Sequence, residues 1–190
     1  MTAAKITTRQ KISAAAKNLF STHGYSQTTI DDIITAAGVT KGAFYHYFKS
    51  KEIICGEIID SIQNEYQNIF ESLPGKLDPL EKLKAVIKQI LELNRSGQWV
   101  NCKLMLRLSG GAQLSQTPIK QKLDDFWKWY IDQYRQLITQ CRDLNLISDK
   151  LSVQQQIDIV TSILIGNVWT KVVFDSSLDD EMVDYIIEKL

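Results

Sequence analysis

Residues 40–43 combine small side chains with a cation, a set that suits close contact with phosphate groups. Thr40, Gly42 and Ala43 carry little bulk, and Lys41 lies among them. A helix that begins here offers backbone N–H groups and the positive end of its dipole to an anion. Glycine inside a helix costs about 1 kcal/mol relative to alanine, so close approach of a ligand to the backbone is the better explanation of Gly42.

Four more side chains extend this candidate surface. Tyr45 and His46 follow one turn later and can donate to phosphate, and Tyr45 can also pack against a thymine methyl group. Lys51 can reach a phosphate across the groove, and Thr29 can do so from the start of an earlier helix. The chemistry that these residue types favour is binding to double-stranded DNA.

Two short helices joined by a tight turn must position these side chains. A threonine caps the first helix, with Asp32 three positions later as an acidic variant of the capping box, and Gly38 ends it. Thr40 caps the second, whose inner face carries Phe44 and Phe48. This helix-turn-helix, at about residues 29–48, has the outline of an element that lies in a DNA groove.

The charges of the chain are unevenly distributed, although the net charge of the 190 residues is zero. Residues 1–51 hold seven lysines and arginines against two acids, a net charge of +5, which leaves −5 for residues 52–190. A basic head on an acidic body predicts that only the head meets a polyanion. A solvated asymmetry without function is the alternative.

Composition excludes several classes of protein. A hydrophobic content of 44% with 23% charged residues is typical of a globular protein, and no apolar run approaches the ~18 residues of a membrane span. The N-terminus lacks the apolar core of a secretion signal, so we expect a cytoplasmic protein with no membrane partner. The three cysteines lack metal-ligand spacing and are interpreted as free thiols. Without paired His and carboxylate ligands or a glycine-rich phosphate loop, we expect no catalytic residues, metal or cofactor.

Hydrophobic periodicity predicts an all-α chain, with an N-terminal three-helix helix-turn-helix head fused to a C-terminal helical body. We expect the head at residues 1–51 and the body at 52–190, with the fourth helix bridging them; that the body is a ligand-sensing and dimerisation domain is implied by the family resemblance described next. The predicted helices run over about 8–22, 29–37, 40–48, 51–73, 79–95, 100–108, 118–146 and 152–174, and from Ser177 to the C-terminus.

The head closely resembles the tetracycline-repressor (TetR/AcrR) family of bacterial transcription regulators over about residues 8–60. The residues that carry the resemblance are Phe20, Gly24, Tyr25, Thr28, Thr29, Ile33 and the continuous run from Ala36 to Glu52. It implies a homodimer on a palindromic operator, most often a repressor, which a small molecule in the body releases from DNA. The DNA contacts that it implies fall on Thr29, Thr40, Lys41, Gly42, Ala43, Tyr45, His46, Tyr47 and Lys51.

Two of these positions leave alternatives open. Tyr47 either packs between the third and fourth helices or reaches a phosphate with its hydroxyl. Ala43 occupies a position where family members often have a polar, base-reading residue. Direct readout of bases is therefore expected to be sparse, with water or DNA shape supplying part of the specificity.

The body offers a candidate ligand pocket and a candidate redox sensor. Aromatic and soft side chains suited to a flat or apolar ligand are Trp99, Met105, Trp127, Tyr130 and Trp169, for which ordinary core packing is the alternative. Cys102 lies near a helix start, which lowers a thiol pKa, and the segment resembles the subgroup that includes the repressor of N-ethylmaleimide reductase, in which Lys171 matches a frequent lysine. A sensor of electrophiles or oxidants is one interpretation of Cys102, and a small buried cysteine is the favoured one.

Dimerisation is assigned to the last two helices, about residues 153–174 and 178–189, which carry apolar stripes. A recognition helix of this size reads few base pairs, so tight binding calls for two heads on two half-sites. The favoured function is a DNA-binding regulator released by a small-molecule or thiol-reactive effector. The alternative is a helical adaptor protein that does not bind DNA.

Overall fold

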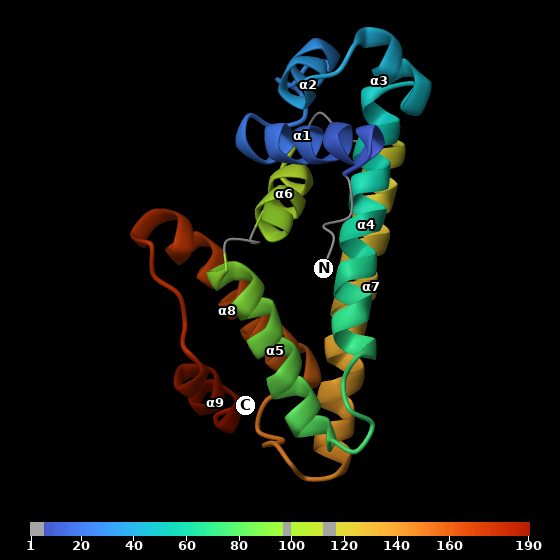
Figure 1. The fold of residues 1–190 in the computed structure, drawn as a ribbon. Helices are drawn as coiled ribbons and strands as arrows, with labels where there is room; N and C mark the ends of the chain where they lie inside the picture. Colours follow the sequence, from blue (N-terminus) through green and yellow to red (C-terminus); the bar gives the residue numbers. More distant parts are fainter. Residues whose placement is uncertain (1–5, 97–99, 112–116) are drawn as a thin grey trace, which may run out of the picture. The chain divides into compact units, whose positions relative to one another are not determined.

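The computed structural model describes residues 6–96, 100–111 and 117–190, and within these ranges the regular elements are all α-helices (Figure 1). The prediction of an all-α chain is confirmed. In chain order the helices are α1 (Thr8–Thr22), α2 (Ile30–Ala37), α3 (Lys41–Tyr47), α4 (Lys51–Glu71), α5 (Pro79–Arg95), α6 (Val100–Ser109), α7 (Pro118–Asp143), α8 (Val153–Phe174) and α9 (Asp180–Glu188).

The chain divides into two compact units. Unit 1 comprises Met1–Gln63 and Lys103–Asp124, and unit 2 comprises Asn64–Cys102 and Asp125–Leu190. The helices α4, α6 and α7 each contribute residues to both units.

Local capping signals set the helices of unit 1. Thr29 and Asp32 form a reciprocal capping box at the start of α2, and Gly38 ends that helix in the left-handed conformation with φ +62°. The Thr40 hydroxyl then accepts from the Ala43 N–H, 3.2 Å away, and starts α3. Because each signal acts within four residues, the sequence places the turn between α2 and α3 correctly.

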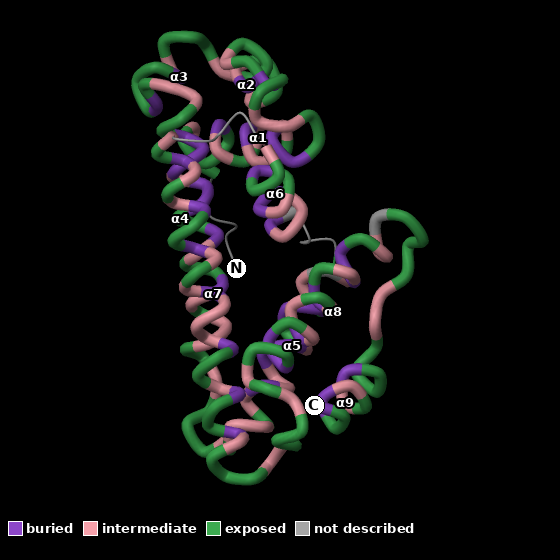
Figure 2. Tube along the Cα trace, turned by 180° about the vertical axis from the view of Figure 1, so that it is seen from behind, coloured by how far each residue is buried: buried purple, intermediate pink, exposed green. Residues whose placement is uncertain are grey.

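Unit 1 has a core of aliphatic and phenylalanine side chains. Phe20 from α1, Ile33 from α2 and Phe44 from α3 are fully buried, and Ile54 and Ile58 continue this core along α4. The aromatic rings of Phe44 and Phe48 lie 6.1 Å apart, as their spacing on one helix face predicts. This packing leaves the opposite face of α3 exposed (Figure 2).

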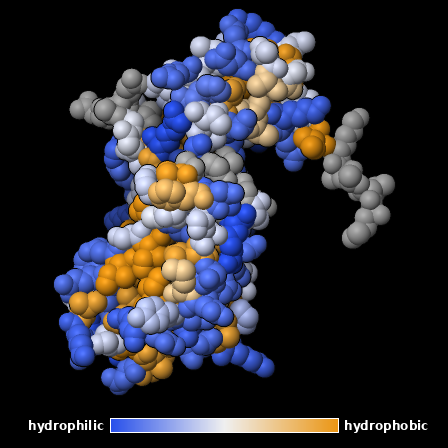
Figure 3. Space-filling model, turned by 90° about the vertical axis from the view of Figure 1, so that its left-hand side faces the viewer, coloured by the Kyte–Doolittle hydropathy of each residue, from blue (hydrophilic) through white to orange (hydrophobic). Residues whose placement is uncertain are grey.

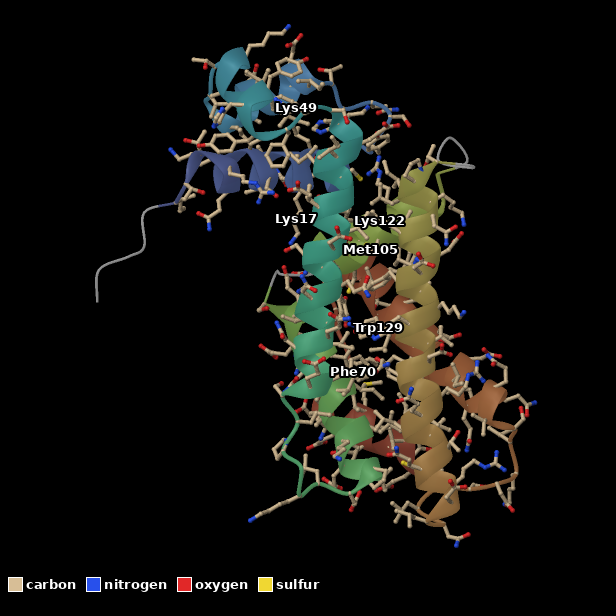
Figure 4. The ribbon with its side chains drawn as sticks, turned by 90° about the vertical axis from the view of Figure 1, so that its right-hand side faces the viewer. Lys17, Lys49, Phe70, Met105, Lys122 and Trp129 are labelled. Atoms are coloured by element: carbon tan, nitrogen blue, oxygen red, sulfur yellow. The ribbon has the colours of Figure 1, made fainter. Side chains whose placement is uncertain are left out.

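Unit 2 has an aromatic core contributed by α4 and α7. The fully or nearly buried rings of Tyr66, Phe126, Tyr130 and Tyr134 contact one another mostly edge to face, with centroids 5.1–5.8 Å apart. Phe70 and Trp129 extend this cluster between the two helices, with ring centroids 5.8 Å apart (Figure 4).

Three helix ends differ from the sequence prediction. The α4 helix ends at Glu71, two residues early. The α7 helix ends at Asp143, since Asn145 adopts φ +53° and the N–H of Leu146 turns back to the Cys141 carbonyl. The α9 helix is capped by Asp179 rather than Ser177, because the Leu178 N–H is held by the Asn167 side chain outside the helix.

Candidate nucleic-acid interface

The exposed face of α3 presents most of the residues predicted to contact DNA. Lys41, Gly42 and His46 are exposed, and Tyr45 and Tyr47 keep 38% and 40% of their surface accessible. A Cβ atom on Gly42 would meet nothing within 4 Å in the protein. Internal packing therefore does not require this glycine, which leaves the open approach to its backbone as the feature that a DNA phosphate can use.

The aromatic side chains of α3 brace one another. The Tyr45 ring contacts buried Phe44 edge to face at 5.4 Å, and the His46 and Tyr47 rings do the same at 4.8 Å. Lys49 donates to the Tyr45 carbonyl over 2.9 Å and so closes the last turn. Tyr45 and Tyr47 are both partly exposed, and a tyrosine hydroxyl can donate to a base edge or a phosphate.

Lys41 has a neighbour that the sequence analysis did not consider. Its ammonium lies 3.7 Å from the Asp31 carboxylate, and the two side chains are 69% and 79% exposed. An ion pair this exposed contributes little to stability. Asp31 therefore partly neutralises the charge of Lys41.

Thr29 and Lys51 lie at the edge of this surface and both have structural partners. The Thr29 hydroxyl accepts from the Asp32 N–H, and the Thr29 N–H donates to the Asp32 carboxylate, which lowers the pKa of that carboxyl. Lys51 donates to the carbonyls of Tyr25 and Thr28 over 2.8 and 2.9 Å, and it lies 4.3 Å from the Tyr25 ring centroid. Partial burial lowers the Lys51 pKa, and one of its three N–H groups remains for a phosphate.

The residues of the predicted ligand pocket differ in their burial. Tyr130 and Met105 are buried, and the Tyr130 hydroxyl lies 3.1 Å from that of Tyr134. Trp127 is half-buried, and Trp99 lies outside the described residues. Placing Trp169 in an interior pocket was wrong, because its side chain is 58% exposed and stacks edge to face on Phe174.

The surroundings of Cys102 favour the interpretation as a small buried cysteine over that as a sensor. Its sulfur lies 2.6 Å from the Tyr66 hydroxyl, and burial raises the thiol pKa, an effect larger than the lowering by that hydrogen bond. The proximity of the helix start therefore does not produce a thiolate. Lys171 does not serve the thiol either, because its ammonium pairs with the Asp175 carboxylate at 2.7 Å.

The arrangement of α2 and α3 is typical of one class of protein. A capped helix-turn-helix with an exposed second helix, carried on a larger helical body, is the architecture of helix-turn-helix DNA-binding proteins. Residues 12–58 match the family described as "Bacterial regulatory proteins, tetR family". This match covers the helix-turn-helix and the start of α4, so it concerns the head of the chain and not its body.

Similar proteins support this assignment. The HTH-type transcriptional regulator AcrR of Shigella flexneri is 41% identical over 92 residues, which cover 45% of this chain and 40% of that protein. The chain thus spans less than half the length of this curated relative. The fold of FadR from Bacillus subtilis, solved with stearoyl-CoA, matches with TM-score 0.73 and 24% identity over 94% of this chain and 95% of that one. The fold of AibR, solved with isovaleryl coenzyme A and operator DNA, matches with TM-score 0.75 and 21% identity over 95% of this chain and 96% of the AibR chain.

These relatives are regulators, in agreement with the expectation that this chain is not an enzyme. Within the described part of the chain, no helix has both the length and the apolar character needed to cross a bilayer. Sequence reasoning missed Asp31 and Arg107, which contacts the end of α1. Asp31 lies in the first turn of α2, within the motif itself, so its charge was there to be found, but no local signal identifies Arg107.

Proposed function

We propose that the chain is a transcriptional regulator that binds a palindromic DNA operator through α3 and acts as a repressor. The observation that carries this proposal is the exposed face of α3, where Lys41, Tyr45 and His46 flank a glycine with open space around it. Basic and hydroxyl side chains there suit phosphates and base edges, whereas Ala43 offers only a methyl group. We therefore expect DNA shape to supply part of the specificity.

A selection experiment tests this proposal. Duplexes enriched from a random library should converge on a two-fold symmetric sequence, and footprinting should protect two half-sites about one helical turn apart or a multiple of it. Tyr45→Ala should weaken binding to the selected duplex more than to random DNA. Leu144→Ala is the control, because Leu144 is 58% exposed in unit 2 and lies outside α3, α8 and α9. Equal losses on selected and random DNA would show that Tyr45 does not read the groove.

We propose that a second copy of the chain covers the exposed apolar surface of α8 and α9. Ile165, Trp169 and Val173, each four residues apart, form a stripe on α8 with 46%, 58% and 51% of their surface exposed. Met182 and Tyr185 on α9 are 48% and 63% exposed. Figure 3, which faces the side where α8 and α9 lie in Figure 1, shows a broad hydrophobic area. Since α8 also buries its opposite face, a self-complementary dimer through both helices explains why it is apolar on two sides.

We propose that a small molecule bound in unit 2 is the effector. FadR and AibR were solved with acyl-CoA ligands, so stearoyl-CoA and isovaleryl-CoA are the first compounds to test on this chain. A ligand that binds only the folded state raises the midpoint of thermal unfolding as its concentration rises above Kd, and the effector should in addition reduce DNA affinity. A thiol-reactive effector is the less favoured class, because burial raises the Cys102 pKa. Membership of the N-ethylmaleimide reductase repressor subgroup stays a prediction.

The helical adaptor is the competing function. The exposure of Lys41, Tyr45 and His46 on one helix favours a DNA-binding regulator over an adaptor. An adaptor does not require basic and hydroxyl side chains to be grouped on one helix. Failure of the wild-type protein to enrich any duplex at low salt would reject the regulator and favour the adaptor.

A further inference from the structure

The backbone caps only half of the C-terminal end of α1. The last four carbonyls of a helix have no partner within it. Here the first two of them, of Leu19 and Phe20, accept from the N–H groups of His23 and Gly24 at 2.8 and 3.1 Å. The next two, of Ser21 and Thr22, need donors from elsewhere.

Arg107 from α6 supplies both missing donors. Its Nη1 donates to the Thr22 carbonyl over 2.9 Å and to the Ser21 carbonyl over 3.3 Å. The last turn of α1 holds no basic residue, so this guanidinium also provides the positive charge that stabilises a helix C-terminus. A residue 85 positions away in sequence thus completes the α1 cap.

Gly24 lets Arg107 come this close. The glycine has φ +91°, and a Cβ built on it would lie 3.2 Å from the Arg107 Nε atom. The guanidinium therefore lies flat against bare backbone at the point where the chain leaves α1.

The other half of the turn is held from α4. The Thr28 hydroxyl donates to the Gly24 carbonyl over 2.8 Å, and Lys51 donates to the carbonyls of Tyr25 and Thr28. The next residue, Thr29, is the N-cap of α2. Side chains of α6 and α4 thus determine the path of the turn that orients α2, and with it α3, on α1.

We propose that Arg107 is a positioning residue for DNA binding: it holds the turn at residues 21–28 so that α2 and α3 keep the geometry that meets the operator. This inference rests on the proposed function. Arg107 itself contacts no DNA in this proposal, so its loss should change affinity without changing the number of phosphate contacts.

The test compares Arg107→Gln with Arg142→Gln in the full-length chain. Arg142 is a matched control because its Nη1 donates over 2.8 Å to a loop carbonyl, of Leu151, within unit 2. The probe is the duplex that the wild-type protein selects from a random library, titrated at several salt concentrations. Hydrogen–deuterium exchange of residues 19–29 is measured in parallel, without DNA.

We expect Arg107→Gln to lose about tenfold in affinity, which corresponds to about 1.4 kcal/mol. The slope of log affinity against log salt should stay unchanged, residues 19–29 should exchange faster, and Arg142→Gln should bind within about twofold of the wild type. Arg107→Lys, which keeps a charge and a donor, should fall between the wild type and Arg107→Gln.

Three results would overturn the proposal. The first is that Arg107→Gln binds the duplex with wild-type affinity. The second is that its salt slope is smaller by about 0.9, which corresponds to one lost phosphate contact. The third is that its residues 19–29 exchange at the wild-type rate. Should Arg107→Gln not fold, Arg107→Lys decides on the same three readouts. If the wild-type protein binds no DNA, the proposed function is rejected. The comparison of hydrogen–deuterium exchange between the wild type and Arg107→Lys would still test the contact between Arg107 and α1.

Discussion

Replacing Lys51 with methionine should destabilise the head of the protein as well as weaken its hold on DNA. The ammonium donates to the carbonyls of Tyr25 and Thr28 and lies over the Tyr25 ring. A charge-assisted hydrogen bond contributes about 1.5–3 kcal/mol when buried, and an exposed cation–π contact about 0.5–1 kcal/mol. Because the site is half exposed, water replaces part of both bonds, so we expect a total loss of about 2 kcal/mol. For a chain of this length that lowers the unfolding midpoint by roughly 4–8 °C.

Differential scanning calorimetry and a salt titration of DNA binding separate the two roles of Lys51. Lys41→Met is the matched control, since its ammonium is exposed and only loosely paired with Asp31. The control should unfold at the wild-type temperature and lose about 0.9 from the salt slope. An unchanged unfolding midpoint in Lys51→Met would refute the internal role. A slope reduced as in Lys41→Met would show that the third N–H of Lys51 also binds phosphate.

Three further predictions concern acid stability, thiol reactivity and assembly. The capping box lowers the pKa of Asp32 in the folded state below its value in the unfolded state. The stability that Asp32 contributes is therefore present above the unfolded-state pKa and is lost as pH falls through the folded-state pKa. In an acid titration followed by circular dichroism, Asp32→Asn should lose helical signal less steeply than the wild type. Raised thiol pKa means little thiolate at neutral pH, so Cys102 should react with iodoacetamide at least tenfold more slowly in the native than in the denatured protein, and equal rates would restore the sensor hypothesis. Ile165→Lys should give monomers in analytical ultracentrifugation, whereas Leu144→Lys, at an exposed apolar site just after α7 and outside α8 and α9, should sediment as the wild type.

The head could be predicted in detail because its signals are local. The capping box at Thr29, the left-handed Gly38 and the N-cap at Thr40 each act within four residues, so the sequence alone places two helices and their turn. The same holds for Asp78 at the start of α5, whose side chain accepts from the Glu81 N–H. Phe44 and Phe48 point inward for an equally local reason, because their spacing is one helical turn.

The roles of single residues in the body depend on contacts that spacing does not encode. Trp169 follows Val168 on a helix that is apolar on both sides, so periodicity cannot tell which of the two faces the interior. Cys102 lies near a helix start, which lowers a thiol pKa, but burial of the thiol raises that pKa, and the burial depends on residues distant in sequence. In both cases tertiary packing decides the environment of the side chain, and local sequence rules do not predict that packing.

Lys51 shows how the same distant contacts alter even a residue of the motif. Its position in the sequence indicates a free cation at the edge of a DNA-binding surface, and the motif fixes its place at the start of α4. The structure directs two of its three N–H groups to the turn that Arg107 holds from the other side. Since both cations stabilise the path of one turn, the two substitutions should not add independently: once one side of the turn is released, the other holds less of it in place. A double variant that loses less operator affinity than the sum of the single losses would support this coupling, and strict additivity would show that the two cations act on separate parts of the head.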